Sequence, residues 1–129
     1  MTELTISTVP APEPTPAAID EDHLGRMTLG DRGLEREVLE IFARQIMLTL
    51  KRIVTAKPAG AAAAAHTLKG SARGVGAWAV ARAAERLEQV AAHDADNHAM
   101  SVAIAELEVA ACEACAVIEA RLGDSSVDH

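Results

Sequence analysis

Apolar residues recur at steps of three and four positions from Asp20 to Leu122, and no run of the chain alternates with the two-residue period of a β-strand. Glycine, proline and aspartate interrupt this pattern near residues 30, 58–60, 74–76 and 94–97. The periodicity therefore predicts an all-α fold in which a short helix precedes four longer ones. Because the loops between the long helices are short, these helices should pack as an up-down-up-down antiparallel four-helix bundle.

The core of such a bundle must be thin. Half of the residues are apolar by type, but many of them are alanine, and the only aromatic residues are Trp78 and Phe42. Side chains of this kind suit closely spaced helices better than two packed sheets. The length of 129 residues is within the usual range for one domain.

Capping residues indicate where the first helices begin. Asp20 can cap a short helix that reaches about Leu29 and ends at Gly30, and Asp31 can cap a long one that reaches about Ala56. The residues that recur at helical spacing in this long helix are Leu34, Val38, Ile41, Phe42, Gln45, Met47, Leu48, Ile53 and Val54. Three more helices are expected over about 58–74, 77–92 and 97–122.

The inner faces of these last three helices follow from the same spacing. In the first of them the inner residues should be Ala61, Ala65, Leu68, Ala72 and Val75. In the next they should be Val80, Ala84, Leu87 and Ala91, and in the last Ile104, Leu107, Ala111, Cys115, Ile118 and Leu122. Gly123 should end the last helix.

The helical domain should span residues 20–123, with a tail at 1–19 and a flexible C-terminus at 124–129. Prolines at 10, 12, 14 and 16 block both helix and sheet in the tail, so we expect it to be disordered. The tail lacks the basic start and apolar run of a secretory signal, and no segment approaches the ~18 apolar residues of a membrane helix. We therefore expect a cytoplasmic protein without a membrane partner.

Charge and cysteine usage exclude other classes of function. The net charge of −7 argues against a nucleic-acid partner, which requires a basic patch with stacking aromatic residues. Cys112 and Cys115 have the spacing of a redox or zinc motif, but they lie mid-helix without a second pair, which favours buried small residues. The histidines at 23, 93, 98 and 129 lack metal-ligand spacing and are expected at the surface, so we predict no metal site.

His66 follows the alanine run at 61–65 and falls off the predicted inner face of its helix, so it should be partly exposed. The residues expected around it are Ala62, Ala63, Lys69, Gly70 and Arg73. A glycine in the middle of a helix costs about 0.5–1 kcal/mol relative to alanine, so Gly70 should serve close approach of another backbone or of a bulky group on His66. We interpret Ala62, Ala63, Gly70 and Arg73 as a partner-binding surface.

The same neighbourhood suggests phosphoryl chemistry. A neutral imidazole is a nucleophile that forms covalent intermediates, and Lys69, one turn along, could balance the charge of a phosphoryl group on His66. His66 lies ten residues before Gly76, so the facing turn of the next antiparallel helix lies near Glu85, Arg86 and Glu88. We predict that Glu88 accepts the imidazole N–H and fixes its tautomer, although a solvated surface glutamate is the alternative.

These residues resemble the histidine-containing phosphotransfer (HPt) domain family. The resemblance is carried by His66-Thr67-Leu68-Lys69-Gly70-Ser71-Ala72, by Gly76-Ala77, by Leu87-Glu88, and upstream by Asp31 and Leu39–Phe42. It covers about residues 20–122 and implies a four-helix bundle with His66 as the phosphorylated residue. It also implies that the partners are receiver domains of response regulators and hybrid histidine kinases, between whose aspartates the phosphoryl group is relayed.

The resemblance also bears on activity and cofactors. The chain has no glycine-rich nucleotide-binding block, so we expect a phosphoryl carrier without kinase activity of its own. We expect no cofactor, with any Mg²⁺ held by the receiver partner, and a monomer. The alternative is a helical adaptor that binds a receiver or kinase domain without transferring phosphate; a phosphohistidine hydrolase or metal-dependent enzyme would need a second catalytic group that is not visible. Trp78 is expected to serve packing more than partner contact.

Overall fold

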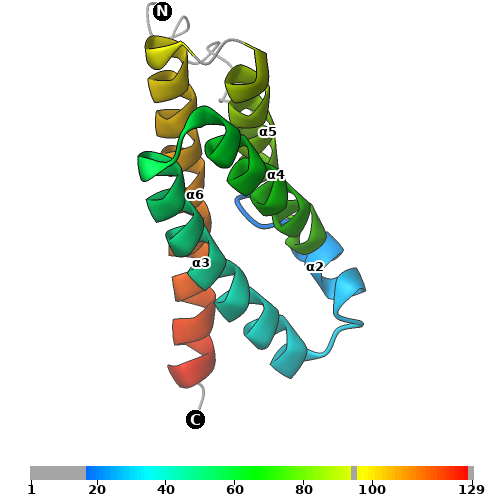
Figure 1. The fold of residues 1–129 in the computed structure, drawn as a ribbon. Helices are drawn as coiled ribbons and strands as arrows, with labels where there is room; N and C mark the ends of the chain where they lie inside the picture. The colour runs from blue at the N-terminus through cyan, green and yellow to red at the C-terminus, as the bar shows by residue number, and fades with distance from the viewer. Residues whose placement is uncertain (1–16, 94–95, 128–129) are drawn as a thin grey trace, which may run out of the picture.

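A computed structural model of the chain describes residues 17–93 and 96–127, with side chains described as far as residue 123. Its helices are α2 (Glu21–Met27), α3 (Arg32–Thr55), α4 (Pro58–Val75), α5 (Trp78–His93) and α6 (Asn97–Val127). Figure 1 shows that short connections bring α4 back beside α3 and α5 back beside α4. Helix α6 contacts both α5 and α3. The part of the chain that the structure describes contains no strand, which confirms the prediction of an all-α fold.

The helix ends follow from local sequence. Asp20 and Asp31 each accept a hydrogen bond at 3.0 Å from the backbone N–H three residues further on, as expected of N-caps. Pro58 occupies the first position of α4, where its missing N–H costs nothing. Gly76 ends α4 with a φ of 84°, a left-handed conformation that favours glycine. The predicted breaks at residues 30, 58 and 76 therefore lie at real helix boundaries.

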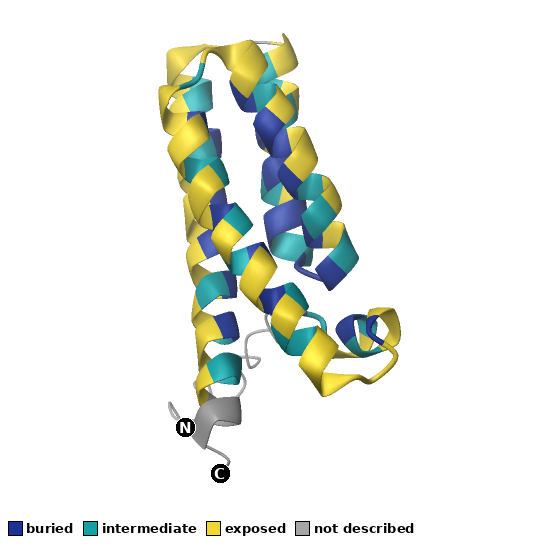
Figure 2. Cartoon of the chain, turned by 60° about the horizontal axis from the view of Figure 1, so that its bottom comes forward, coloured by how far each residue is buried: buried dark blue, intermediate teal, exposed yellow. Residues whose placement is uncertain are grey.

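The core lies where the long helices face one another. The closest packing joins α4 to α5, and α3 and α6 each contact a member of this pair as well as each other. Figure 2 shows the buried residues gathered on the inward sides of the helices. The five residues predicted on the inner face of α4 are all buried, and so are Val80, Ala84 and Leu87 of α5. Alanines at these contacts let the helix axes approach closely, which offsets the scarcity of large side chains.

Helix α3 shows where periodicity alone is ambiguous. Its buried residues are Leu39, Phe42, Ile46 and Ile53. Most of the apolar residues that predicted this helix lie instead at the surface, namely Leu34, Ile41, Met47, Leu48 and Val54. The helix therefore carries two apolar stripes, and the sequence pattern merged the outer one with the inner one.

Both predicted ends of the domain need correction. Ile19, which we assigned to the tail, is only 1% exposed and belongs to the core, so the packed domain begins before residue 20. Helix α6 continues through Gly123 to Val127, because Gly123 does not adopt the positive φ that ends a helix at Gly76. The remaining predicted tail residues 1–16 and the terminal residues 128–129 lie outside the described part of the chain.

A cluster that we call the α2 corner, formed by Asp20, His23, Gly76 and Trp78, fastens α2 to the turn between α4 and α5. The backbone N–H of Asp20 donates to the carbonyl of Gly76 at 2.9 Å, and the indole N–H of Trp78 donates to the Asp20 carboxylate at 2.9 Å. The rings of His23 and Trp78 meet edge to face with centroids 4.9 Å apart. Trp78 thus serves packing, as predicted, whereas His23 is half-buried rather than at the surface.

Ion pairs also hold the N-terminal turn of α2, next to the α2 corner. Arg121 of α6 pairs with both Glu21 of α2 and Glu35 of α3.

None of the helices in the described residues is both long and apolar enough to cross a lipid bilayer.

Candidate phosphoryl-transfer site

His66 projects from the middle of α4, with its side chain 66% exposed. The neighbouring Ala65 and Leu68 are buried in the core, so the helix that carries the imidazole is firmly packed. The structure therefore combines a rigid support with an accessible ring, and it confirms that His66 lies off the inner face of its helix.

Glu88 of α5 brings a carboxylate to this ring. Its Oε2 lies 2.8 Å from Nδ1 of His66, although the two residues are 22 positions apart. An ionised carboxylate can only accept hydrogen bonds, so the proton in this contact belongs to Nδ1. The Nε2 atom then carries the lone pair of the neutral ring. Glu88 lies opposite His66, where the turn at Gly76 predicted it.

Lys69 completes a three-residue chain of contacts. Its Nζ donates to Oε1 of Glu88 at 2.8 Å, so one carboxylate bridges the imidazole and the ammonium. The sequence placed this ammonium beside a phosphoryl group on His66, whereas in this structure it binds Glu88. The lysine side chain is 15% exposed, which leaves little of it free to move in solvent.

The pKa of Glu88 follows from these contacts. The hydrogen bond from Lys69 is the largest influence and lowers this pKa, desolvation opposes the shift, and the hydrogen bond with His66 lowers it further. Glu88 is therefore held ionised well below neutral pH, which is the state that an acceptor for the Nδ1 proton requires.

The predicted partner-binding residues lie around His66 with different surroundings. A Cβ added at Gly70 would meet nothing within 4 Å, so no contact inside the domain requires the glycine and its surface is open. Ala63 is exposed and Ala62 is half-buried, both one turn before His66. Arg73 is drawn toward α5, where its guanidinium lies 3.6 Å from Glu85.

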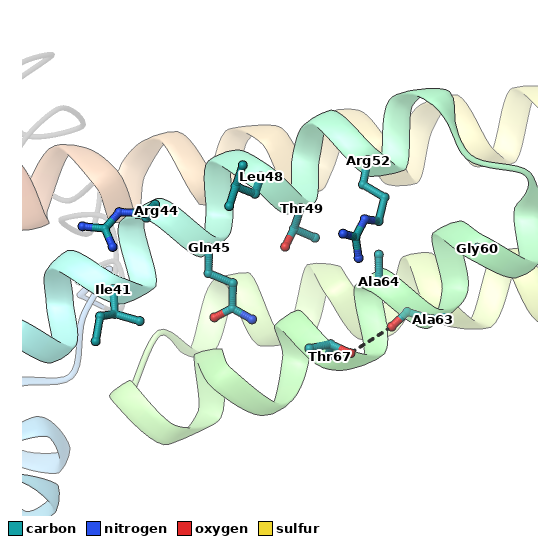
Figure 3. Close-up of a pocket in the computed structure, with 10 residues that line it drawn as sticks. All are labelled: Ile41, Arg44, Gln45, Leu48, Thr49, Arg52, Gly60, Ala63, Ala64 and Thr67. Atoms are coloured by element: carbon teal, nitrogen blue, oxygen red, sulfur yellow. Dashed lines mark hydrogen bonds between the residues drawn. The ribbon is translucent and has the colours of Figure 1, made fainter.

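A groove between α3 and α4, which we did not predict, borders this surface. It encloses about 620 Å³ and is lined by Ile41, Arg44, Gln45, Leu48, Thr49, Arg52, Gly60, Ala63, Ala64 and Thr67. Figure 3 shows Gln45, Thr49 and Arg52 reaching from α3 toward the small residues of α4. The exposed apolar stripe of α3 was the sequence signal for it, but periodicity did not separate that stripe from the buried one.

The cysteines do not form a second site. Both are free thiols, but Cys112 is exposed and Cys115 only half-buried, so the prediction that they are buried small residues was wrong for Cys112. Burial raises the pKa of Cys115, which lowers its thiolate fraction and its reactivity. Among the described residues, no three His, Cys, Asp or Glu side chains come together as metal ligands would.

Comparison with known proteins points to one family. The family model described as Hpt domain matches residues 36–127, which include His66, Lys69 and Glu88. No curated protein and no solved structure matches the chain.

Proposed function

Because the chain belongs to the Hpt domain family, we propose that it relays a phosphoryl group from a hybrid histidine kinase to a response regulator, passing it between receiver-domain aspartates through His66. The observation that carries this proposal is the bridge of Glu88 between Nδ1 of His66 and Nζ of Lys69, each at 2.8 Å. It supports an imidazole with a defined tautomer on an exposed face, which is what reversible phosphorylation needs.

The transfer step is a displacement at phosphorus. With the proton on Nδ1, the Nε2 lone pair of His66 attacks the phosphorus of the donor phosphoaspartate. The Nε2–P bond forms while the P–O bond to the aspartate breaks, and the aspartate leaves as a carboxylate. The ring keeps its Nδ1–H and gains positive charge, which the hydrogen bond to Glu88 stabilises. The reverse step passes the phosphoryl group to the acceptor aspartate.

Lys69 has a supporting part in this proposal. By donating to Glu88 it keeps that carboxylate ionised, and its ammonium supplies positive charge one helical turn from the phosphorylated ring. Gly70, Ala62 and Ala63 leave room for the approaching receiver, and Arg73 lies at the edge of the same surface.

The carrier itself is proposed to hold no cofactor, and the Mg²⁺ that phosphoaspartate chemistry uses is assigned to the receiver partner. Members of this family carry phosphoryl groups rather than catalyse turnover, so the kinase activity is assigned to a separate protein. We propose a monomer that works in the cytoplasm. The up-down-up-down order of the long helices belongs to the same proposal and is supported by the contacts of α3 with both α4 and α6.

The direct test mixes the purified protein with receiver domains that have been phosphorylated with labelled phosphate. The wild type is expected to acquire phosphate that is labile in acid and stable in base, and His66→Gln is expected to acquire none. Transfer to His66→Gln, or no transfer to the wild type from any receiver, would refute the proposal.

The alternative is an adaptor that binds a receiver or kinase domain without taking its phosphate. The orienting carboxylate at His66 argues against it, because a docking surface alone has no need of a fixed tautomer. An adaptor would bind the receiver equally well as wild type and as His66→Gln, and neither protein would become labelled.

A further inference from the structure

Charge is distributed unevenly between the two sides of His66. On the α5 side, both nearby cations of α4 are paired, Lys69 with Glu88 and Arg73 with Glu85. On the α3 side, Arg44 and Arg52 line the groove and have no ion-pair partner among the described residues. No carboxylate lines this groove, although the chain as a whole carries a net charge of −7. The groove is therefore a local site of positive charge on an acidic protein.

The same groove is apolar at its α3 wall. Ile41 is 55% exposed and Leu48 61% exposed, and nothing in the described part of the chain covers them. They lie seven residues apart, so they occupy the same face of α3 two turns apart. A partner that fills this groove must offer apolar side chains to Ile41 and Leu48 and anionic groups to Arg44 and Arg52.

The groove is continuous with the site. Ala63 and Thr67 line its α4 wall, and His66 lies beside Thr67 and one turn after Ala63. Gly70 extends this strip of small residues one turn beyond His66, and a Cβ there would meet nothing within 4 Å. No large side chain of α4 separates the groove from the imidazole, so one partner can occupy the groove and reach Nε2 together.

We propose that Arg44 and Arg52 determine which receiver domain the protein serves, by pairing with carboxylates that flank an apolar stripe on a helix of the receiver seated between α3 and α4. A helix is the element that fits a shallow groove between two helices, where residues at three- and four-residue steps provide the apolar contact. The unpaired guanidiniums provide selectivity, because a receiver with cations at those positions is repelled. This inference rests on the proposed phosphotransfer function.

The test compares transfer rates at several salt concentrations. The probe is the phosphorylated receiver domain that labels the wild type fastest in a panel. Arg44→Glu and Arg52→Glu are each expected to lower the second-order transfer rate about tenfold or more at low ionic strength. The difference from the wild type should shrink at 0.5 M salt because screening weakens exposed charges. Arg82→Glu is the matched control, since it makes the same charge change on an exposed arginine of α5, and it should stay within about twofold of the wild type.

The apolar part has its own variant pair. Leu48→Asn should lower the transfer rate at every salt concentration, whereas Val109→Asn on α6, where the valine is 59% exposed, should not. Phosphoramidate, a small phosphoryl donor that needs no docking, should label His66 equally in all of these variants and so reports that the site is intact.

The outcomes separate the two proposals. If no receiver labels the wild type, the phosphotransfer function itself fails. If receivers label the wild type and both arginine variants at equal rates and with equal salt dependence, the function stands and the selectivity of the groove is refuted. A second result would also refute the selectivity of the groove. If the arginine variants transfer at the wild-type rate but no longer bind vesicles of anionic lipid that the wild type binds, the groove serves a membrane surface.

Discussion

The site at His66 and the α2 corner each depend on a carboxylate that accepts two hydrogen bonds. Glu88 accepts from the imidazole of His66 and the ammonium of Lys69, while Asp20 accepts from the indole of Trp78 and a backbone N–H. They differ in what surrounds the carboxylate. At the α2 corner the backbones of residues 20 and 76 touch, whereas around His66 one side of the ring is open. Close backbone packing makes such a carboxylate a structural link, whereas an open side leaves the groups it binds available for chemistry.

The strongest way to break the α2 corner without touching His66 is Gly76→Val. A Cβ at this position would lie 3.0 Å from Cβ and 3.1 Å from the carbonyl oxygen of Asp20, and its φ of 84° disfavours a branched side chain. The variant should lose about 2–4 kcal/mol of unfolding free energy, measured by urea denaturation. Gly74→Ala is the control, since a Cβ there meets nothing within 4 Å, and it should be neutral or stabilising. Equal stability of the two variants would show that residues 20 and 76 do not pack as described.

Glu88→Gln should have the opposite profile to Gly76→Val, with a large effect on the rate of phosphotransfer and a small effect on stability. The amide no longer balances Lys69 and can present an N–H to the ring, so Nε2 is less well oriented. We expect phosphotransfer from a receiver to slow roughly ten- to a hundredfold. Glu85→Gln, on the same helix and paired with Arg73, is the control and should retain nearly full transfer. Equal rates for the two variants would remove Glu88 from the mechanism.

Trp78→Phe tests the carboxylate of the α2 corner. The hydrogen bond from Trp78 is the main reason that the pKa of Asp20 is lowered, with the backbone N–H of His23 contributing next. A lowered pKa in the folded state adds stability above the unfolded pKa, and this stability is lost as the pH falls through the folded value. Trp78→Phe should therefore lower the Tm at pH 7 by about 2–5 °C.

The same variant should also lose less of its remaining stability than the wild type when acidified below about pH 4. Thermal melts of both proteins between pH 7 and pH 2.5 measure this slope. Parallel curves would show that the indole does not stabilise the ionised carboxylate.

Lys69→Ala should slow transfer less than Glu88→Gln does, by about threefold to tenfold, because the imidazole keeps its acceptor and loses only nearby positive charge. Since the ion pair with Glu88 is partly exposed, the loss of unfolding free energy should stay near or below about 1 kcal/mol. Lys69→Met retains the buried stem and separates packing from charge. A large drop in Tm for both variants would make Lys69 structural.

Gly70→Leu should have the smallest effect on stability, and unlike Lys69→Ala it should stabilise the fold. Leucine is a better helix former than glycine and its Cβ meets nothing, so unfolding free energy should rise by about 0.5–1 kcal/mol. Transfer from a receiver should nevertheless slow, because the side chain would stand on the surface that the receiver approaches. An unchanged rate would mean that the glycine leaves no clearance that docking uses.

The parts of the site that could be predicted from the sequence are those that depend on residues close together in the chain. His66, Lys69 and Gly70 lie within one helical segment, and the antiparallel turn at Gly76 was enough to bring Glu88 opposite them. The α2 corner was missed because Asp20 and Trp78 are 58 positions apart and only tertiary packing joins them.

Two other features depended on choices that the sequence leaves open. The groove was missed because α3 has two apolar stripes, and only the packed structure shows that Leu39 and Ile46 face the core while Ile41 and Leu48 face outward. The end of α6 was placed too early because Gly123 can be either a helix terminator or a helical residue, and its φ decides which.

In the proposed mechanism, Glu88 holds the proton on Nδ1 of His66 and leaves Nε2 to take the phosphoryl group. The most direct measurement is an NMR spectrum that correlates ring protons with nitrogens in protein labelled with ¹⁵N-histidine, recorded before and after phosphorylation by phosphoramidate. We expect a neutral ring protonated on Nδ1 before the reaction and a single phosphohistidine bonded through Nε2 after it. Protonation on Nε2, or phosphate attached to Nδ1, would contradict the proposed mechanism.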